Sequence, residues 1–174
     1  IIGLAPGKDL KGGPRFYVSG PDLQCIESLD GCGFNVTALG KDIGRASGMK
    51  MCYAGLTKGT MTLHTVVLLA AQKLGLLTEL LAELSYSQEL VLSQMHNRVP
   101  RLPADSERWI GEMDEIVKTF NAVEVPSKFH KAASEIFSLL ALTPFAKENR
   151  ATMDLNRDLS EAINVYVQHL PNRK

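Results

Sequence analysis

The sequence lacks the charge excess and the cysteine content that mark several classes of protein. Its 19 Lys and Arg balance 19 Asp and Glu, so the formal net charge is zero. A chain without excess positive charge lacks the net electrostatic attraction that draws a protein to nucleic acid or to an anionic membrane surface. The three cysteines, Cys25, Cys32 and Cys52, include no Cys-x-x-Cys pair. They are too few for a disulfide framework and favour reduced thiols in a cytoplasmic protein.

Long apolar runs and metal-ligand spacings are missing as well. The most apolar stretch, residues 66–71, lies between His64 and Lys73 and is too short to span a bilayer. The four histidines are scattered without the spacing of a metal site. The chain begins with Ile and no basic segment precedes an apolar stretch there, so we expect no signal peptide and a start within a longer protein. We expect a soluble protein with no metal, nucleic-acid or membrane partner.

The composition is that of a globular protein, with 45% hydrophobic and 22% charged residues. The sequence pattern changes near residue 44 and divides the chain into two parts. In the first part, short β-type runs alternate with Gly and Pro at residues 1–3, 15–19 and 35–39. Residues 21–29 form a helix candidate between the last two runs, with Pro at its first turn. Strand, helix and strand within about 30 residues predict a βαβ unit. Cys25 and Cys32 are expected to be small buried residues of this part.

The second part is helical to its end. Residues 44–74 contain no Pro and stop at Gly75, which predicts one helix of roughly 45 Å. Its second half is apolar nearly all round, which is typical of a helix enclosed by others. Asp105 or Ser106 is expected to cap a later amphipathic helix, and Asn156 or Asp158 the last one. We therefore predict a mainly α fold, a helical bundle around a long central helix, preceded by a short βαβ remnant of a Rossmann sheet.

Two expectations concern single side chains in this helical part. Glu112 and Glu115 fall on the polar side of the helix that follows Asp105, where a solvated face is expected. Phe129 falls on the apolar stripe of the next helix, where a buried position is expected.

The long helix carries a stripe of possible functional groups. At 100° per residue, one line within about 40° contains Lys50, Ala54, Thr57, Met61 and His64. An amine held against apolar groups can exchange a proton near neutral pH, which makes Lys50 a candidate for proton transfer. The alternative is a lysine that extends to solvent near a helix end. His64 taken alone fits a core or boundary histidine.

Gly44 to Leu63 resemble the central-helix motif of the 6-phosphogluconate dehydrogenases and β-hydroxyacid dehydrogenases, Gly-x-Gly-x-x-x-Lys-x-x-x-Asn. In that family the helix follows a Rossmann domain and begins an all-helical domain used for dimerisation and substrate closure. Residues 1–43 resemble the last strand–helix–strand of the Rossmann domain. The resemblance therefore implies two domains, a nucleotide-binding remnant at 1–43 and a helical dimerisation and substrate domain at 44–174, in a homodimer.

The same resemblance implies roles for individual residues. Lys50 matches the catalytic lysine, which acts as general base on the substrate hydroxyl and as acid in the reverse direction. The substrate-binding positions that the resemblance implies are Ser47, Gly48, Ala54, Thr57 and Lys58. Ala54 stands where the family has an Asn and cannot hydrogen-bond a carboxylate. Thr57 stands where the phosphogluconate enzymes carry a Glu and is a poor proton donor. Lys58 replaces a Tyr and is either an anion contact or a solvated lysine.

These departures argue against 6-phosphogluconate itself and leave a small anionic hydroxy acid, or the matching carbonyl compound, as the implied substrate. The implied cofactor is NAD or NADP. No Gly-x-Gly-x-x-Gly stands between a strand and a helix here, so we expect a nucleotide domain outside this chain to bind it. The chain alone is then not a competent oxidoreductase. Two alternatives remain: a non-catalytic helical dimerisation or interaction module descended from such an enzyme, and a domain of an imine-type reductase.

Overall fold

The computed structural model describes residues 2–4 and 13–171, with side chains from residue 13 onward. The chain divides into two compact units, Ile1–Ala54 and Gly55–Lys174. The division falls inside a long helix, and each unit is described by itself below. The domain boundary expected after residue 43 stays a prediction.

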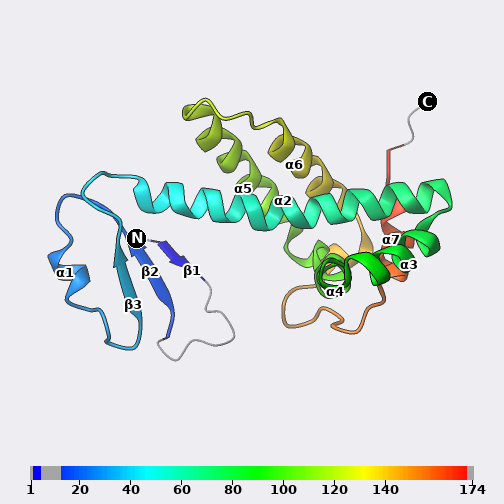
Figure 1. Ribbon diagram of the computed structural model, residues 1–174, viewed down its shortest axis with the longest axis horizontal. Coiled ribbons are helices and arrows are strands. Elements are labelled where there is room, and N and C mark those ends of the chain that lie inside the picture. Colours follow the sequence, from blue (N-terminus) through cyan, green and yellow to red (C-terminus); the bar gives the residue numbers. More distant parts are fainter. Residues whose placement is uncertain (1, 5–12, 172–174) are drawn as a thin grey trace. The chain divides into compact units, whose positions relative to one another are not determined.

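The first unit is a small sheet with one short helix (Figure 1). Strand β1 covers Ile2–Leu4, β2 covers Arg15–Val18 and β3 covers Asn35–Ala38, in the order β1-β2-β3. Strands β2 and β3 are parallel, and helix α1, Gln24–Glu27, connects them. The predicted βαβ unit is thereby confirmed, but its helix has four residues instead of the predicted 21–29 and does not include Pro21. Strand β1 adds an antiparallel pairing along β2.

Glycine allows the segment before β2 to approach the turn before β3 closely. Gly13 has φ +78°, and a Cβ there would lie 2.2 Å from the carbonyl oxygen of Gly33. Only glycine fits a position with both a positive φ and so close a backbone neighbour. The Asp30 carboxylate then accepts a hydrogen bond of 2.7 Å from the backbone N–H of Val36 and fixes the entry into β3.

The rest of the described chain is helical, which confirms the predicted mainly α fold. Helix α2 is the long helix, 30 residues over Arg45–Leu74, as the absence of Pro predicted. The elements that follow are α3 (Leu77–Ser87), α4 (Glu89–Arg98), the 3₁₀ turn η1 (Val99–Arg101), α5 (Pro103–Ala122), α6 (Lys128–Ala141), the 3₁₀ turn η2 (Pro144–Lys147) and α7 (Leu159–Gln168).

The two predicted helix N-caps have different outcomes. Helix α7 begins after Asp158, whose side chain accepts hydrogen bonds from the backbone N–H groups of Ser160 and Glu161, so the predicted N-cap is confirmed. Helix α5 begins earlier than predicted, at Pro103, because proline is preorganised for the first helical position and η1 leads directly into it. Ser106 lies inside the first turn, where its hydroxyl donates to the Leu102 carbonyl, and it does not cap the helix.

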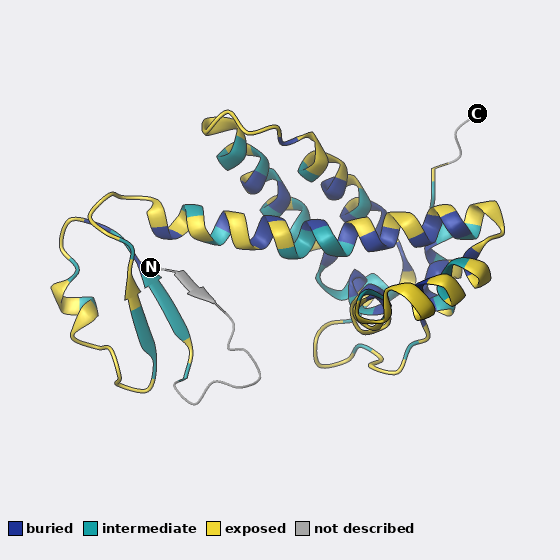
Figure 2. Ribbon diagram, in the orientation of Figure 1, coloured by how far each residue is buried: buried dark blue, intermediate teal, exposed yellow. Residues whose placement is uncertain are grey.

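Buried residues of the second unit, dark blue in Figure 2, are numerous on α5, α6 and α7. Several large side chains there are 0% exposed: Met113, Ile116, Phe137, Leu140, Ile163 and Tyr166. Tyr166 donates a hydrogen bond of 3.0 Å to the Val99 carbonyl, which satisfies its hydroxyl in the interior. Burial raises the pKa of Tyr166 well above its ordinary value. Helix α7 is thus fastened to the corner between α4 and α5.

The expected burial of Cys25, Cys32 and Phe129 is wrong. Cys25 and Cys32 are exposed, and Cys25 lies in the short helix α1, which has no buried residue. Phe129 is half exposed, because it is the second residue of α6 and covers Gly59 with only one edge of its ring. Among the described helices, none is both long and apolar enough to cross a membrane.

Candidate functional site

The residues assigned to substrate by resemblance lie along α2. The helix is unbroken from Arg45 to Leu74, so the helical spacing on which the prediction depends is present. Ser47 is exposed, Gly48 is half-buried and Ala54 is buried. Thr57 and Lys58 are half-buried and belong to the second unit.

Lys50 is half-buried in the second turn of α2. Within the described residues no carboxylate forms an ion pair with its ammonium group.

Lys58 is held by a neighbouring helix. Its Nζ lies 2.7 Å from Oε2 of Glu112 on α5, and the two side chains are only 12% and 21% exposed. The same Nζ lies 5.4 Å from the ring centre of Trp109, the single tryptophan, within cation–π range. The solvated face expected at Glu112 is wrong, because this polar position of α5 faces α2.

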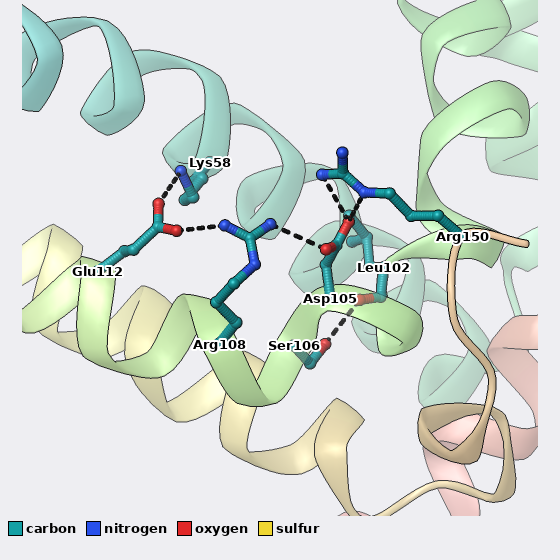
Figure 3. A network of polar contacts seen from close by, with 7 residues as sticks. All are labelled: Lys58, Leu102, Asp105, Ser106, Arg108, Glu112 and Arg150. Atoms are coloured by element: carbon teal, nitrogen blue, oxygen red, sulfur yellow. Dashed lines mark hydrogen bonds and ion pairs between the residues drawn. The ribbon is translucent and has the colours of Figure 1, made fainter. Parts of the chain in front are cut away.

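The pair extends into a row of alternating charges (Figure 3). Arg108 donates to Glu112 and, at 2.8 Å, to Asp105. Arg150, from the loop after η2, lies 3.2 Å from the other oxygen of Asp105. Burial by itself would raise the pKa of Asp105, but its hydrogen bonds and charge interactions with Arg150 and Arg108 outweigh burial, so the pKa is lowered. The Asp105 carboxylate, in turn, raises the pKa of Arg108.

This row of charges limits the ability of Lys58 to bind an anionic ligand. Its charge is already balanced by Glu112, so an anionic ligand would have to compete with a carboxylate 2.7 Å away. The i,i+3 and i,i+4 pairs of Arg108 with Asp105 and Glu112 are visible in the sequence. The contacts of Lys58 with Glu112 and of Arg150 with Asp105 join residues far apart in the chain, so no local sequence pattern predicts them.

The described residues do not fit a dinucleotide-binding loop. The turn from β2 to α1 contains Pro21, which has no N–H, and Asp22, which would repel a pyrophosphate. Helix α1 has four residues and no side-chain cap, so it offers no helical N-terminus of useful length. Nor do any three His, Cys, Asp or Glu side chains of the described ranges gather as they would around a metal ion.

Comparison with known proteins gives a family match over part of the chain and similar solved structures. Residues 71–140 match a family described as a domain of unknown function, DUF1932. A conserved hypothetical protein from Sinorhizobium meliloti 1021 superposes with a TM-score of 0.73 at 21% identity, over 91% of this chain and 53% of the other. No curated protein is similar to the chain in sequence.

The second structural relative is the conserved protein MTH1747, of unknown function, whose structure is similar to 3-hydroxyacid dehydrogenases. It superposes with a TM-score of 0.61 at 28% identity, over 74% of this chain and 50% of the other. The chain thus spans about half the length of each of these two solved chains.

Proposed function

We propose that the chain is the helical substrate and dimerisation part of an NAD(P)-dependent oxidoreductase related to the 6-phosphogluconate and β-hydroxyacid dehydrogenases. Structural kinship to 3-hydroxyacid dehydrogenases, through MTH1747, supports the proposal at the level of fold. The substrate is a small anionic hydroxy acid or the matching carbonyl compound. NAD or NADP is bound mainly by a nucleotide domain outside this chain, and no metal is involved.

One observation carries the catalytic half of the proposal: Lys50 lies in the second turn of a long helix that directly follows a βαβ unit, and no carboxylate of the described residues forms an ion pair with it. In the proposed reaction Lys50 accepts the proton of the substrate hydroxyl during oxidation and returns it in the reverse direction. Ser47, Gly48, Ala54 and Thr57 line the substrate. Lys58 orients an anionic group only in competition with Glu112, or holds α5 in place.

The decisive experiment replaces Lys50 in a protein that joins this chain to its nucleotide domain. A positioned proton-transfer group contributes about 10²- to 10⁴-fold to the rate, so Lys50→Ala is expected to lower kcat at least roughly 10²-fold. Cofactor affinity should stay nearly constant. Lys41→Ala, which removes an exposed lysine that precedes the helix, is the matched control. Turnover of Lys50→Ala within a few-fold of the parent would contradict the catalytic role and leave the fold assignment standing.

A second candidate function is a non-catalytic dimerisation module, favoured by an apolar stripe on α2. The stripe consists of exposed side chains at intervals of seven, four and seven residues: Leu56, Leu63, Val67 and Leu74. This spacing is that of the a and d positions by which helices pack against each other. Both candidates require self-association, and we propose that the stripe is buried between two copies of the chain.

A further inference from the structure

A cavity of about 320 Å³ opens between α2 and α4 within the second unit. Its polar lining includes two pairs spaced by one helical turn, Thr60 and His64 on α2 and Gln94 and Arg98 on α4. Leu56 and Met61 supply apolar wall. Residues four apart lie on the same side of a helix, so each pair presents its polar groups to the same space.

His64 is the residue of this lining with a buried ring nitrogen that no protein group satisfies in the described structure. It is only 8% exposed, and its Nδ1 is buried with no hydrogen-bond partner in the described structure. An unsatisfied polar atom in the interior costs about 1–3 kcal/mol. Burial lowers the pKa of His64, so the ring is neutral near pH 7 and can donate one hydrogen bond and accept another. The sequence showed a lone histidine on the stripe, and the structure places it in a cavity wall.

Arg98 gives the cavity its charge. No Asp or Glu lines the cavity, and among the described residues no carboxylate pairs with the Arg98 guanidinium. The Gln94 amide stands one turn before it on α4. A guanidinium beside an amide, a hydroxyl and a neutral imidazole matches the oxygens of a carboxylate or phosphate, because all four groups can donate hydrogen bonds to an anion.

We propose that the cavity between α2 and α4 binds a small organic anion, a carboxylate or phosphate compound held by Arg98, Gln94, Thr60 and His64. Its volume equals that of roughly ten water molecules and lies at the lower end of small-molecule sites. Leu56 and Met61 then face the carbon skeleton. Thr57 also borders the cavity, so the site adjoins the proposed substrate contacts, but its two α4 residues have no part in the proposed proton transfer.

Calorimetric titration of the chain with orthophosphate and with succinate, in a buffer free of both, tests the proposal without requiring turnover. We expect one saturable site per chain for at least one of the two anions, and which anion binds identifies the headgroup. Arg98→Gln should weaken that binding at least about tenfold, because a charge-assisted hydrogen bond is lost. Lys118→Gln removes one exposed positive charge of α5, away from the cavity, and should leave the affinity within about twofold, because exposed charges contribute little.

A second measurement reports on His64 directly. The ring resonances of His64, assigned by comparison with His64→Gln, should shift in proportion to the occupancy found by calorimetry. Three results would overturn the proposal: no saturable heat with either anion up to about 10 mM, a range far above a useful affinity; equal weakening in Arg98→Gln and Lys118→Gln; or saturable binding that leaves the His64 ring unmoved.

Discussion

Asp105 joins two arginines that come from different parts of the second unit. Its Oδ1 accepts from Arg108, one turn on in α5, and its Oδ2 accepts from Arg150 in the loop after η2. The carboxylate therefore fixes a loop to a helix as well as ordering the row that leads to Lys58. Because its pKa is lowered in the folded state, the folded protein stabilises the ionised form.

The stabilisation by Asp105 should depend on pH in a defined direction. A carboxyl with a lowered folded pKa stabilises the fold above its unfolded value, near pH 4, and loses that contribution as the pH falls through the folded pKa. Asp105→Asn is expected to lower the free energy of unfolding by about 1–2 kcal/mol at pH 7. The difference should shrink toward zero well below pH 4. Urea unfolding followed by Trp109 fluorescence at both pH values measures it, and a difference independent of pH would contradict the argument.

At the scale of elements, two glycines bring α2 close to α5 and α6. A Cβ at Gly55 would lie 3.2 Å from Nε2 of His130 and 3.2 Å from Cζ of Phe120. A Cβ at Gly59, one turn on, would lie 2.8 Å from the ring of Phe129. The half-exposed Phe129 ring can move aside, whereas Gly55 also faces the fully buried Ile116. Gly55 is therefore the position at which the packing of the helices leaves no room.

Gly55→Ala tests this packing. Overfilling a tight contact costs about 1–3 kcal/mol, while replacing a helical glycine by alanine returns up to about 1 kcal/mol. We expect a net destabilisation of about 1 kcal/mol in urea unfolding. Gly111→Ala is the matched control, because Gly111 lies within α5 and a Cβ there meets nothing within 4 Å. That variant should be stabilised by about 0.5–1 kcal/mol. Equal stabilisation of both variants would show that α2 is not close-packed at Gly55.

Elements were predictable where the signal is local. The Pro-free run before Gly75 predicts α2, the Gly and Pro punctuation predicts the βαβ unit, and Asp158 announces α7 through its capping chemistry. The start of α5 was missed because a proline can open a helix as well as end one.

Contacts between elements were not predictable in the same way. The sequence pattern predicts a solvated position for Glu112. In the structure α5 packs against α2, and Glu112 forms an ion pair with Lys58. Arg98 and Gln94 carry no signal at all in the sequence, since an exposed polar face of a short helix is ordinary. Of the candidate site, the sequence indicates the α2 side chains, and tertiary packing supplies their partners.

At the scale of the whole molecule, the apolar stripe of α2 predicts self-association. Exposed leucine and valine at heptad-type spacing gain free energy when a second helix removes them from water. We expect a homodimer by sedimentation equilibrium at micromolar concentration, and a monomer for Leu63→Glu. Leu155→Glu places the same charge at an exposed leucine of the loop before α7 and should leave the dimer intact. A parent chain that is monomeric would contradict the prediction directly.

The whole chain should also fail to bind a nicotinamide dinucleotide. The β2–α1 turn offers a proline and an acidic residue where a pyrophosphate requires close backbone N–H groups. Titration with NADH or NADPH is therefore expected to give no saturable heat below about 1 mM. A site in the micromolar range would mean that the first unit binds the nucleotide through contacts other than a glycine-rich turn.

The hydrogen bond between Tyr166 and Val99 has a consequence for folding during translation. The two residues are 67 positions apart, a distance that a ribosome covers in roughly 3–13 s. During that interval the nascent chain contains Val99 but lacks Tyr166, whose side chain is 0% exposed in the folded unit. Apolar side chains that are buried in the folded unit therefore stay in contact with water until the last helix has been made. Transiently exposed apolar surface of this kind favours chaperone binding, so a chain that stalls before residue 166 presents an incomplete core to chaperones for seconds or longer.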